Sequence, residues 1–503
     1  MESKVSGFLK EAMAPEIQNN LMAPALERTF PVHLPLITEI NMAHVLMLTK
    51  KGIIDRNAAS KLARAVIDLQ AGGPSSFTLN PALEDSYFNY EARLIETVGP
   101  DVGGRVHIGR SRNDLKATLD RMRARKVALQ VMADLLDLRS ALVRQGRTYT
   151  SVIAPGYTHL QPAQPITFGY YLLGVAHGIE RDYQRIADCY TRINKCPLGA
   201  AAIAGTSFPI DRKMTALALG FDGVAYHAQD AIATRDTIIE LLSSCTLLSQ
   251  TIGRMAQDFY VMTTYEFGTL SLPDSVAITS SIMPQKKNMA ALEILKGRVA
   301  AMTGALVTAL SAYKAVPYSH AQDGNMEGMR WTWDAFEEVV AMVPVATLVA
   351  ERAEPAEERM LELVRGNFST VTDLADTLVR ETEMSFREAH HLVGRVVRIA
   401  IAEELKADQI TGDLLDRAAS ETVGRKIGLP EPILKAALDP IKTMEAKTGS
   451  GGPSAADIAT MADDLEANLR EDAAVLARRK RQVEESNAVL VADFNELARQ
   501  EDA

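Results

Sequence analysis

The stretch LKATLDRMRARKVALQVMADLLDLRSALVRQ, residues 115–145, decides the fold class of this chain. It contains neither glycine nor proline and consists mainly of residues that favour helices. Its apolar positions recur every three, four or five residues, close to the period of an α-helix: Leu119, Met122, Val127, Val131, Leu135, Leu138 and Leu142. The pattern predicts one continuous helix about 45 Å long, at 1.5 Å per residue.

The spacing of the 21 prolines leaves room for further long helices. Proline-free stretches cover residues 101–154, 210–272, 285–316 and 356–429. Within the second of these, residues 236–260 repeat the helical pattern. We find no sustained period-two alternation and no Asn-Gly hairpin between apolar runs. The sequence therefore predicts an all-α fold with a long central helical bundle.

The length of 503 residues exceeds one ordinary core and favours two or three domains. We expect an N-terminal helical domain over residues 1–110, made of short helices broken by proline and glycine. The long-helix bundle would occupy residues 111–360, and a C-terminal helical domain residues 361–503. The last part holds a glycine-rich loop at 448–454 and a charged surface helix after Ala455.

The composition excludes several classes of protein. A net charge of −10, from 54 basic and 64 acidic residues, argues against a nucleic-acid partner. The three cysteines, Cys189, Cys196 and Cys245, form no cluster, so we predict neither a disulfide framework nor a metal site. No signal peptide and no run of about 18 apolar residues occurs, so we expect a cytoplasmic protein without a membrane partner.

Three polar segments interrupt the helical pattern. The first loop is HIGRSRND, residues 107–114, the second is GYTHLQPAQP, residues 156–165, and the third is TSSIMPQKKN, residues 279–288. Each also has a plain structural interpretation. The first would be a helix N-cap with solvated arginines, the second a loop with one structural histidine, and the third a basic surface turn.

Together the three loops suit one kind of chemistry. The arginines of the first loop offer forked donors at a helix N-terminus, which can bind a carboxylate. The histidine of the second loop can transfer a proton near neutral pH. The third loop is cationic and can close over an anion. No nucleotide-binding or nucleophile-elbow motif competes with them, so we predict no cofactor. We expect abstraction of a proton next to a carboxylate, whose intermediate needs dense hydrogen-bond donors.

The loops also carry a family resemblance. The third loop resembles the signature GSSxMPxKxN of the aspartase/fumarase superfamily, with Thr279 in place of the first glycine. The first two resemble the argininosuccinate lyase branch, which reads HTGRSRND and GYTHLQ-AQP, with Ile108 replacing threonine. The resemblance runs from about residue 38 to about residue 455.

The resemblance implies three helical domains and a homotetramer around a shared bundle of about twenty helices. It also implies that each active site takes its loops from three different chains. Members of the superfamily remove a proton from Cβ and expel an amine or hydroxide from Cα, which gives fumarate.

Residue by residue, the resemblance implies that Ser280 acts as the general base in its alkoxide form. His159 would be the acid or a carboxylate-binding partner, oriented by Glu293. Ser281 would donate to a substrate carboxylate. The two carboxylates of the succinyl part would be clamped by the following residues: Ser111, Arg112, Asn113, Thr158, Lys286 and Asn288, with Arg235 as a further candidate.

The departures from argininosuccinate lyase concern the leaving group. That branch reads KGLPLAYNKDLQEDKE, in which Tyr, Gln and Lys hold the arginine half. The matching positions here are His320, Asn325 and Gly328. Because a polar site that loses its partners discriminates strongly, we expect weak or absent cleavage of argininosuccinate. We predict that His320 and Asn325 line the pocket of a different amine.

Among relatives, the resemblance points to lyases of ethylenediamine-N,N'-disuccinate, an aminopolycarboxylate chelator. Two interpretations remain beside it. One is an argininosuccinate lyase with a rearranged arginine pocket. The other belongs to a different class, a non-catalytic structural protein of the crystallin kind.

Overall fold

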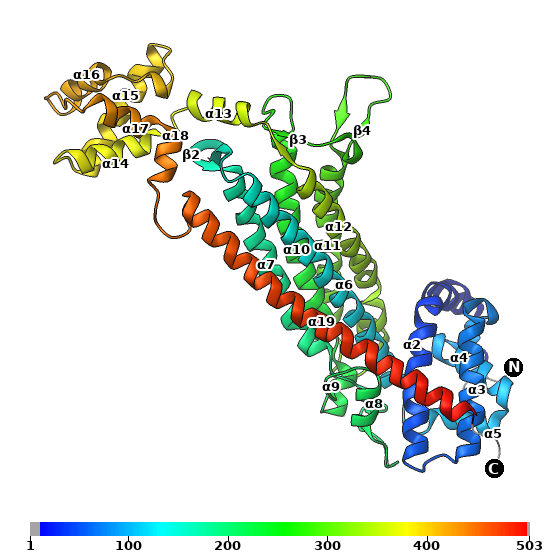
Figure 1. Cartoon of the computed structure of the whole chain (residues 1–503). Coiled ribbons are helices and arrows are strands. Elements are labelled where there is room, and N and C mark those ends of the chain that lie inside the picture. The colour runs from blue at the N-terminus through cyan, green and yellow to red at the C-terminus, as the bar shows by residue number, and fades with distance from the viewer. Residues whose placement is uncertain (1–10, 500–503) are drawn as a thin grey trace.

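Long antiparallel helices dominate the computed structural model, which describes residues 11–499 (Figure 1). The central bundle consists of α6 (Arg112–Thr148), α7 (Phe168–Ile193), α10 (Asp236–Met262), α11 (Ala290–Tyr313) and α12 (Arg330–Arg352). The helix predicted over residues 115–145 lies within α6, and that predicted over 236–260 lies within α10. The predicted helical fold class is confirmed.

The largest hydrophobic core runs along this bundle. Each helix contributes fully buried side chains, among them Leu135, Leu172, Leu242, Leu292 and Val339. These residues come from α6, α7, α10, α11 and α12 in turn. Since one apolar stripe per helix faces the shared core, the period read from the sequence sets the packing.

A second core lies at the N-terminal end of the bundle. It is built by α2 (Ala23–Lys50), α3 (Arg56–Gly72) and α4 (Ser86–Val98), with the short α5 (Pro100–Gly103). The expectation of short helices was wrong for α2, whose 28 residues continue through Pro31 and Pro35. A proline inside a helix costs about 3 kcal/mol. Burial of one face offsets this cost at Leu26, Phe30, Leu34 and Ile37.

Several shorter elements complete the chain. α1 (Pro15–Ile17) and the π-helical turn η1 (Gln18–Met22) precede α2, and α8 (Arg212–Ala218) and α9 (Ala228–Ala233) follow α7. After α12 come α13 (Glu357–Gly366), α14 (Val371–Glu381), α15 (Phe386–Ala402), α16 (Gly412–Thr422), α17 (Glu431–Leu438) and α18 (Pro440–Glu445). Helices α14 to α17 share a third core around Leu378, Leu392 and Leu415.

The last helix, α19 (Ala455–Arg499), returns along the whole bundle to the N-terminal helices (Figure 1). Its sequence predicted a surface helix, yet Leu465 joins the bundle core and Phe494 joins the N-terminal core. The buried Arg139 of α6 fastens it, donating to Asp472 at 2.5 Å and to Glu180 of α7 at 2.8 Å. The domain boundaries at residues 110 and 360 stay a prediction.

Three small antiparallel strand pairs lie at the far end of the bundle. β1 (Ile153–Thr158) pairs with β2 (Gln161–Thr167), β3 (Leu270–Ser271) with β6 (Glu354–Pro355), and β4 (Ile278–Thr279) with β5 (Lys287–Asn288). The sequence did not indicate these strands. They shape the second and third polar loops.

Two helical stretches are long and apolar enough to cross a membrane by length and composition alone. In residues 15–50 the apolar window is 67% buried within the fold, as expected of a core helix. In α11 the corresponding window is only 17% buried. Large exposed apolar side chains also gather on α10, α11 and α12: Leu247, Ile294, Val307, Leu310, Trp331, Val345 and Leu348. Groups of exposed apolar side chains are often found where a protein contacts another molecule.

Candidate active site

The first loop is held rigidly at the start of α6. Ser111 is the N-cap residue and forms a capping box with Asp114: the Asn113 N–H donates to Ser111 Oγ, and the Ser111 N–H donates to Asp114 Oδ1 at 2.9 Å. The other carboxylate oxygen accepts N–H groups from Gly199 at 2.8 Å and Ala201 at 3.0 Å. Burial raises the pKa of Asp114 to about 6. The capping interpretation of this loop is therefore confirmed.

Arg112 is not a solvated arginine. Its Nη1 donates to Glu84 at 2.7 Å and to Asp85 at 3.1 Å, and its guanidinium lies 4.0 Å from the ring centre of Phe88. Asn113 donates through Nδ2 to the Ala202 carbonyl at 3.2 Å. Both side chains are half-buried, so the loop offers fixed donors at a helix N-terminus.

Beside the first loop lies a cavity of about 100 Å³, lined from α2, α6 and the segment before α12. His320 and Asn325 line it together, and Asn325 Nδ2 donates to His320 Nδ1 at 3.0 Å. Arg235 also lines it, with its Nε 3.2 Å from Asp120. The structure thus brings His320, Asn325 and Arg235 together at one cavity, which α6 lines from Lys116 onward, just after the first loop.

Gly328 closes one side of this region by close packing. It follows the π-helical turn η6 (Asp323–Glu327). A Cβ at this position would lie 2.6 Å from the Cβ of Ala312 in α11. Because real Cβ contacts are essentially never that short, a lysine cannot stand here without moving α11.

The second loop is the tip of the β1–β2 hairpin. Thr158 pairs with Gln161, and the two residues between them, His159 and Leu160, have φ values of 54° and 57°. Two consecutive left-handed residues form a type I′ turn, which favours Asn-Gly. Each such residue other than glycine costs about 1 kcal/mol or more. Thr158 and His159 are exposed.

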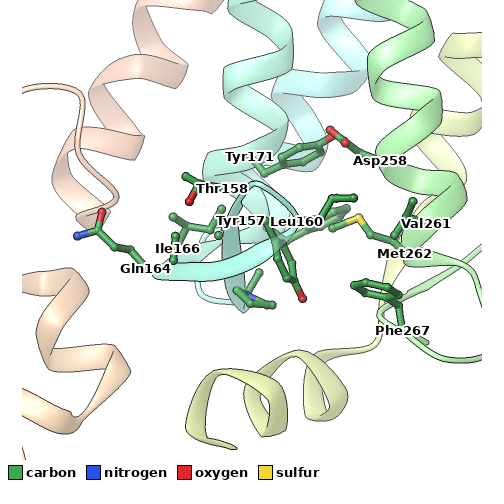
Figure 2. A pocket seen from close by; sticks show the side chains of 15 residues that line it. Tyr157, Thr158, Leu160, Gln164, Ile166, Tyr171, Asp258, Val261, Met262 and Phe267 are labelled. Atoms are coloured by element: carbon green, nitrogen blue, oxygen red, sulfur yellow. The ribbon is translucent and has the colours of Figure 1, made fainter. Parts of the chain in front are cut away.

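An apolar cavity of about 340 Å³ lies beneath this hairpin (Figure 2). Tyr157, Met262 and Phe267 contribute to its wall, and Leu160 reaches over it from the turn. Tyr171 donates to Asp258 at 2.9 Å at its edge. The hairpin therefore lies over an apolar cavity, and its His159 side chain is exposed.

The third loop connects β4 to β5. Ser280 Oγ accepts the N–H groups of Met283 at 3.1 Å and Ile282 at 3.4 Å. Such donors favour negative charge on the oxygen that they contact. Ser281 and Lys286 are exposed, and Asn288 lies half-buried in β5.

The two lysines of the third loop differ. Lys287 Nζ lies 2.8 Å from Asp274 and donates to the Leu272 carbonyl. Within residues 11–499, no carboxylate lies within 4.0 Å of the Lys286 ammonium group. Of the two lysines of this loop, Lys287 is therefore paired with a carboxylate of residues 11–499 and Lys286 is not.

Glu293 lies in the first turn of α11 and is exposed. It accepts a hydrogen bond from Tyr260 at 3.2 Å, which raises the pKa of Tyr260. It does not contact His159 within the chain. The predicted pair of His159 and Glu293 would have to form between chains.

The predicted site residues lie at opposite ends of the bundle (Figure 1). The 37 residues of α6 separate the first loop from the second by about 55 Å, at 1.5 Å per residue. Arg235 is the N-cap residue of α10 and pairs with Asp120 in the N-terminal part of α6, and the 27 residues of α10 then lead about 40 Å toward the third loop. A single chain therefore does not assemble the predicted site.

Comparison with known proteins identifies the chain's relatives. A family described as "Lyase" matches residues 32–304, and one described as "Argininosuccinate lyase C-terminal" matches residues 368–445. Argininosuccinate lyase 1 of Shouchella clausii is 41% identical over 466 residues, covering 93% of this chain and 94% of the relative. Argininosuccinate lyase of Methanothermobacter thermautotrophicus is 35% identical, covering 86% and 92%.

The solved structures that resemble this chain are also lyases of this kind. EDDS lyase in complex with formate is 32% identical, with a TM-score of 0.87 and 97% coverage of both chains. An EDDS lyase variant with bound fumarate has the same identity and coverage and a TM-score of 0.88. A class II fumarase from Schistosoma mansoni, 17% identical, covers 84% of this chain and 92% of its own with a TM-score of 0.68, and shares the fold.

Proposed function

We propose a reaction for this chain from the premise that it belongs to the aspartase/fumarase superfamily of lyases, in the branch of argininosuccinate lyase. It is a fumarate-forming carbon–nitrogen lyase. As its substrate we propose ethylenediamine-N,N'-disuccinate, an aspartate substituted on nitrogen. Two eliminations would release two fumarates, with N-(2-aminoethyl)aspartate between them and ethylenediamine at the end.

One observation argues against arginine as the leaving amine, and the similarity to EDDS lyase supports the diamine in its place. The three groups that would read an arginine are replaced by His320, Asn325 and Gly328. The last position has no room for a side chain, because a Cβ there would lie 2.6 Å from the Cβ of Ala312. A pocket built for arginine needs charged and polar partners for the arginine end, and their loss is costly.

In the proposed mechanism Ser280 Oγ, as the alkoxide, removes the proton from Cβ of the succinyl part. The electron pair forms the Cα–Cβ double bond, and the bond from Cα to nitrogen breaks. The amine leaves with a proton supplied by His159 or by solvent. Two N–H groups on Ser280 Oγ and the uncompensated Lys286 support the charged base. As predicted, we propose that Ser281 donates to one substrate carboxylate and that the two carboxylates are clamped by these residues, with Arg235 as a further candidate: Ser111, Arg112, Asn113, Thr158, Lys286 and Asn288.

We also propose a homotetramer in which each site takes loops from three chains. Two observations support it. The loops of one chain lie at opposite ends of a bundle about 55 Å long. The exposed apolar side chains of α10, α11 and α12 offer the surface for contact between chains. We propose that the enzyme works in the cytoplasm, without a cofactor, a nucleic-acid partner or a membrane.

The test is fumarate release, followed by ultraviolet absorbance, with (S,S)-ethylenediamine-N,N'-disuccinate and argininosuccinate side by side. We expect turnover of the first alone, and a loss of about 100-fold or more in kcat for Ser280→Ala. Near-normal turnover of that variant would refute the role of Ser280. Tight complexes of the chelator with copper should be poorer substrates, because the amine and carboxylate groups are occupied.

Two alternatives remain. Argininosuccinate lyase is favoured by the name of the relative at 41% identity, and faster turnover of argininosuccinate would establish it. A crystallin-like structural protein would release no fumarate from any N-substituted aspartate. The presence of Ser280, His159 and Lys286 opposes this second alternative, because a structural role does not require them.

A further inference from the structure

Glu84 has an unusual backbone conformation beside the first loop. It follows the 3₁₀ turn η3 (Pro81–Leu83) with a φ of 65° and a ψ of −53°. The Asp85 N–H donates to the Leu83 carbonyl at 2.7 Å, which closes a γ-turn of the rare and strained hand around Glu84. Strained residues of this kind are often found at functional sites. A function of the Glu84 side chain would account for the strain.

The Glu84 carboxylate has a single partner, Arg112 of the first loop. Its Oε2 accepts from Arg112 Nη1 at 2.7 Å, and the two side chains are 30% and 32% exposed. Within residues 11–499 this carboxylate forms no other hydrogen bond or ion pair. The Arg112 guanidinium also lies 4.0 Å from the ring centre of Phe88, so it keeps its place when Glu84 moves away.

Asp85, the next residue, is fixed much more firmly. Its side chain is 10% exposed, and it caps α4 by accepting the Phe88 N–H at 3.0 Å. It also accepts from Lys116 at 3.0 Å and from Arg112 at 3.1 Å. Burial raises the pKa of Asp85, but its cationic and N–H partners together lower the pKa below the ordinary value. Of the two carboxylates on Arg112, Glu84 is therefore the one that can leave.

Residues 81–84 form a short flap between two anchored ends. Both ends are held by Asn89 of α4, which is 4% exposed. Its Oδ1 accepts the Asn80 N–H at 2.7 Å, and its Nδ2 donates to the Asp85 carbonyl at 2.9 Å. The flap itself is half-buried. Because its ends are held, a rotation of the backbone at Glu84 redirects this side chain without moving α4.

The charges around Arg112 offset one another in the empty site. Three cationic and three acidic side chains gather here: Arg110, Arg112, Lys116, Glu84, Asp85 and Glu91. Among the described residues, a substrate carboxylate therefore meets no excess of positive charge while Glu84 stays. When Glu84 leaves, Arg112 and Lys116 share the one carboxylate of Asp85. The uncompensated charge then attracts an anion.

We propose that Glu84 is a built-in competitor of the substrate for Arg112. It occupies Arg112 in the empty site, and a carboxylate of the substrate displaces it. Release of the strained turn offsets part of the lost ion pair, so the exchange is easier than for an unstrained glutamate. The proposal rests on the proposed function, because it concerns the carboxylate clamp of that reaction. Glu84 thereby sets the affinity for the succinyl part whatever amine the substrate carries.

The test measures the binding of succinate, a dicarboxylate that cannot undergo elimination. Its Kd for the intact enzyme is obtained by isothermal titration calorimetry, and KM is measured with ethylenediamine-N,N'-disuccinate. Glu84→Gln keeps the shape of the side chain and removes its charge. We expect the Kd of succinate and the KM of the substrate to fall about 3-fold to 10-fold, the worth of one partly exposed ion pair. The change should appear in KM rather than in kcat.

Further variants assign the effect to the contact with Arg112. Glu84→Gly removes both the carboxylate and the strain, so succinate should bind more tightly and the melting temperature should not fall. In an Arg112→Ala background, Glu84→Gln should give no gain in affinity, because the shared partner is absent. Glu421→Gln is the matched control, since Glu421 pairs at 2.5 Å with Arg395 in the C-terminal helices. It should bind succinate as the wild type does.

The outcomes are distinct. Unchanged or weaker binding of succinate by Glu84→Gln overturns the proposal, because Glu84 would then orient Arg112 for the substrate instead of competing with it. A gain that persists without Arg112 overturns it as well. Succinate binding needs no turnover, so an enzyme that releases no fumarate from any N-substituted aspartate refutes the proposed reaction and still allows this test.

Discussion

Two inactive variants of this enzyme should restore activity to each other when their chains are mixed. Arg112→Ala damages the first loop and Ser280→Ala damages the third. These loops lie at opposite ends of the bundle, about 40 Å apart along the 27 residues of α10. If each site combines the first loop of one chain with the third loop of another, a mixed assembly contains sites in which both loops are intact.

The size of the effect follows from counting chains. In an equal mixture, the chain that supplies the first loop of a site is the Ser280→Ala chain with a probability of one half, and its first loop is then intact. The chain that supplies the third loop is the Arg112→Ala chain with the same probability, and its third loop is then intact. About a quarter of all sites in a randomly mixed oligomer are then intact, so we expect about 25% of wild-type activity.

The assay mixes the two purified variants in urea, removes the denaturant and measures fumarate release. Arg112→Ala mixed with Asn113→Ala is the matched control, since both changes lie in the first loop and no site can recover. Activity of the first mixture no higher than that of its parents would refute a site shared between chains. Recovery in the control mixture would refute the assignment of both residues to one loop of one site.

Three further predictions follow from single contacts. His159→Asn suits the left-handed turn, so we expect the melting temperature to be kept or raised, while kcat falls about 100-fold or more. Arg139→Met leaves Glu180 and Asp472 without their shared cation and should lower the free energy of unfolding by about 3–5 kcal/mol in urea titrations, whereas Arg144→Met should have little effect. The pKa of Asp114 is about 6 in the folded chain and about 3.9 unfolded, so the folded state binds more protons between these values and its stability falls as pH rises through this window, by about 3 kcal/mol. Asp114→Asn should remove this part of the pH dependence of the urea midpoint, and an unchanged slope would contradict the buried carboxylate.

The long helices could be predicted because their period is visible in the sequence. Residues 115–145 show it directly, and α6 extends it at both ends. Helix α2 could not be predicted, since Pro31 and Pro35 indicate a break and only the tertiary burial of Phe30 and Leu34 holds the helix together. At this position the packing of the helix against the core outweighs the tendency of proline to break a helix.

The hairpin of the second loop was hidden for a different reason. A type I′ turn is recognised by Asn-Gly, and this turn is His159-Leu160. Because neither histidine nor leucine favours the left-handed conformation, the residues of this turn do not indicate it in the sequence. It is visible only once the pairing of Thr158 with Gln161 is known.

The separation of the loops could have been found from the sequence. A helix of about 45 Å between the first and second loops already prevents them from meeting in one chain. What the sequence cannot supply is which chains meet, because the apolar positions of α10, α11 and α12 have the same period whether they face the core or a partner. The exposure of Val307 and Leu310 in the folded chain distinguishes these two faces.

The strained backbone at His159 can be explained by a site shared between chains. A left-handed histidine and leucine cost about 1 kcal/mol or more each, and no hydrogen bond or ion pair from residues 11–499 to the exposed His159 side chain offsets this. The hairpin rests instead on the apolar cavity lined by Tyr157 and Phe267, and Leu160 covers part of that cavity. This arrangement holds His159 outward at the end of the bundle. If the first loop of another chain meets it there, the cost of the turn is offset by a contact that the single chain lacks, and the strain belongs to the shared site.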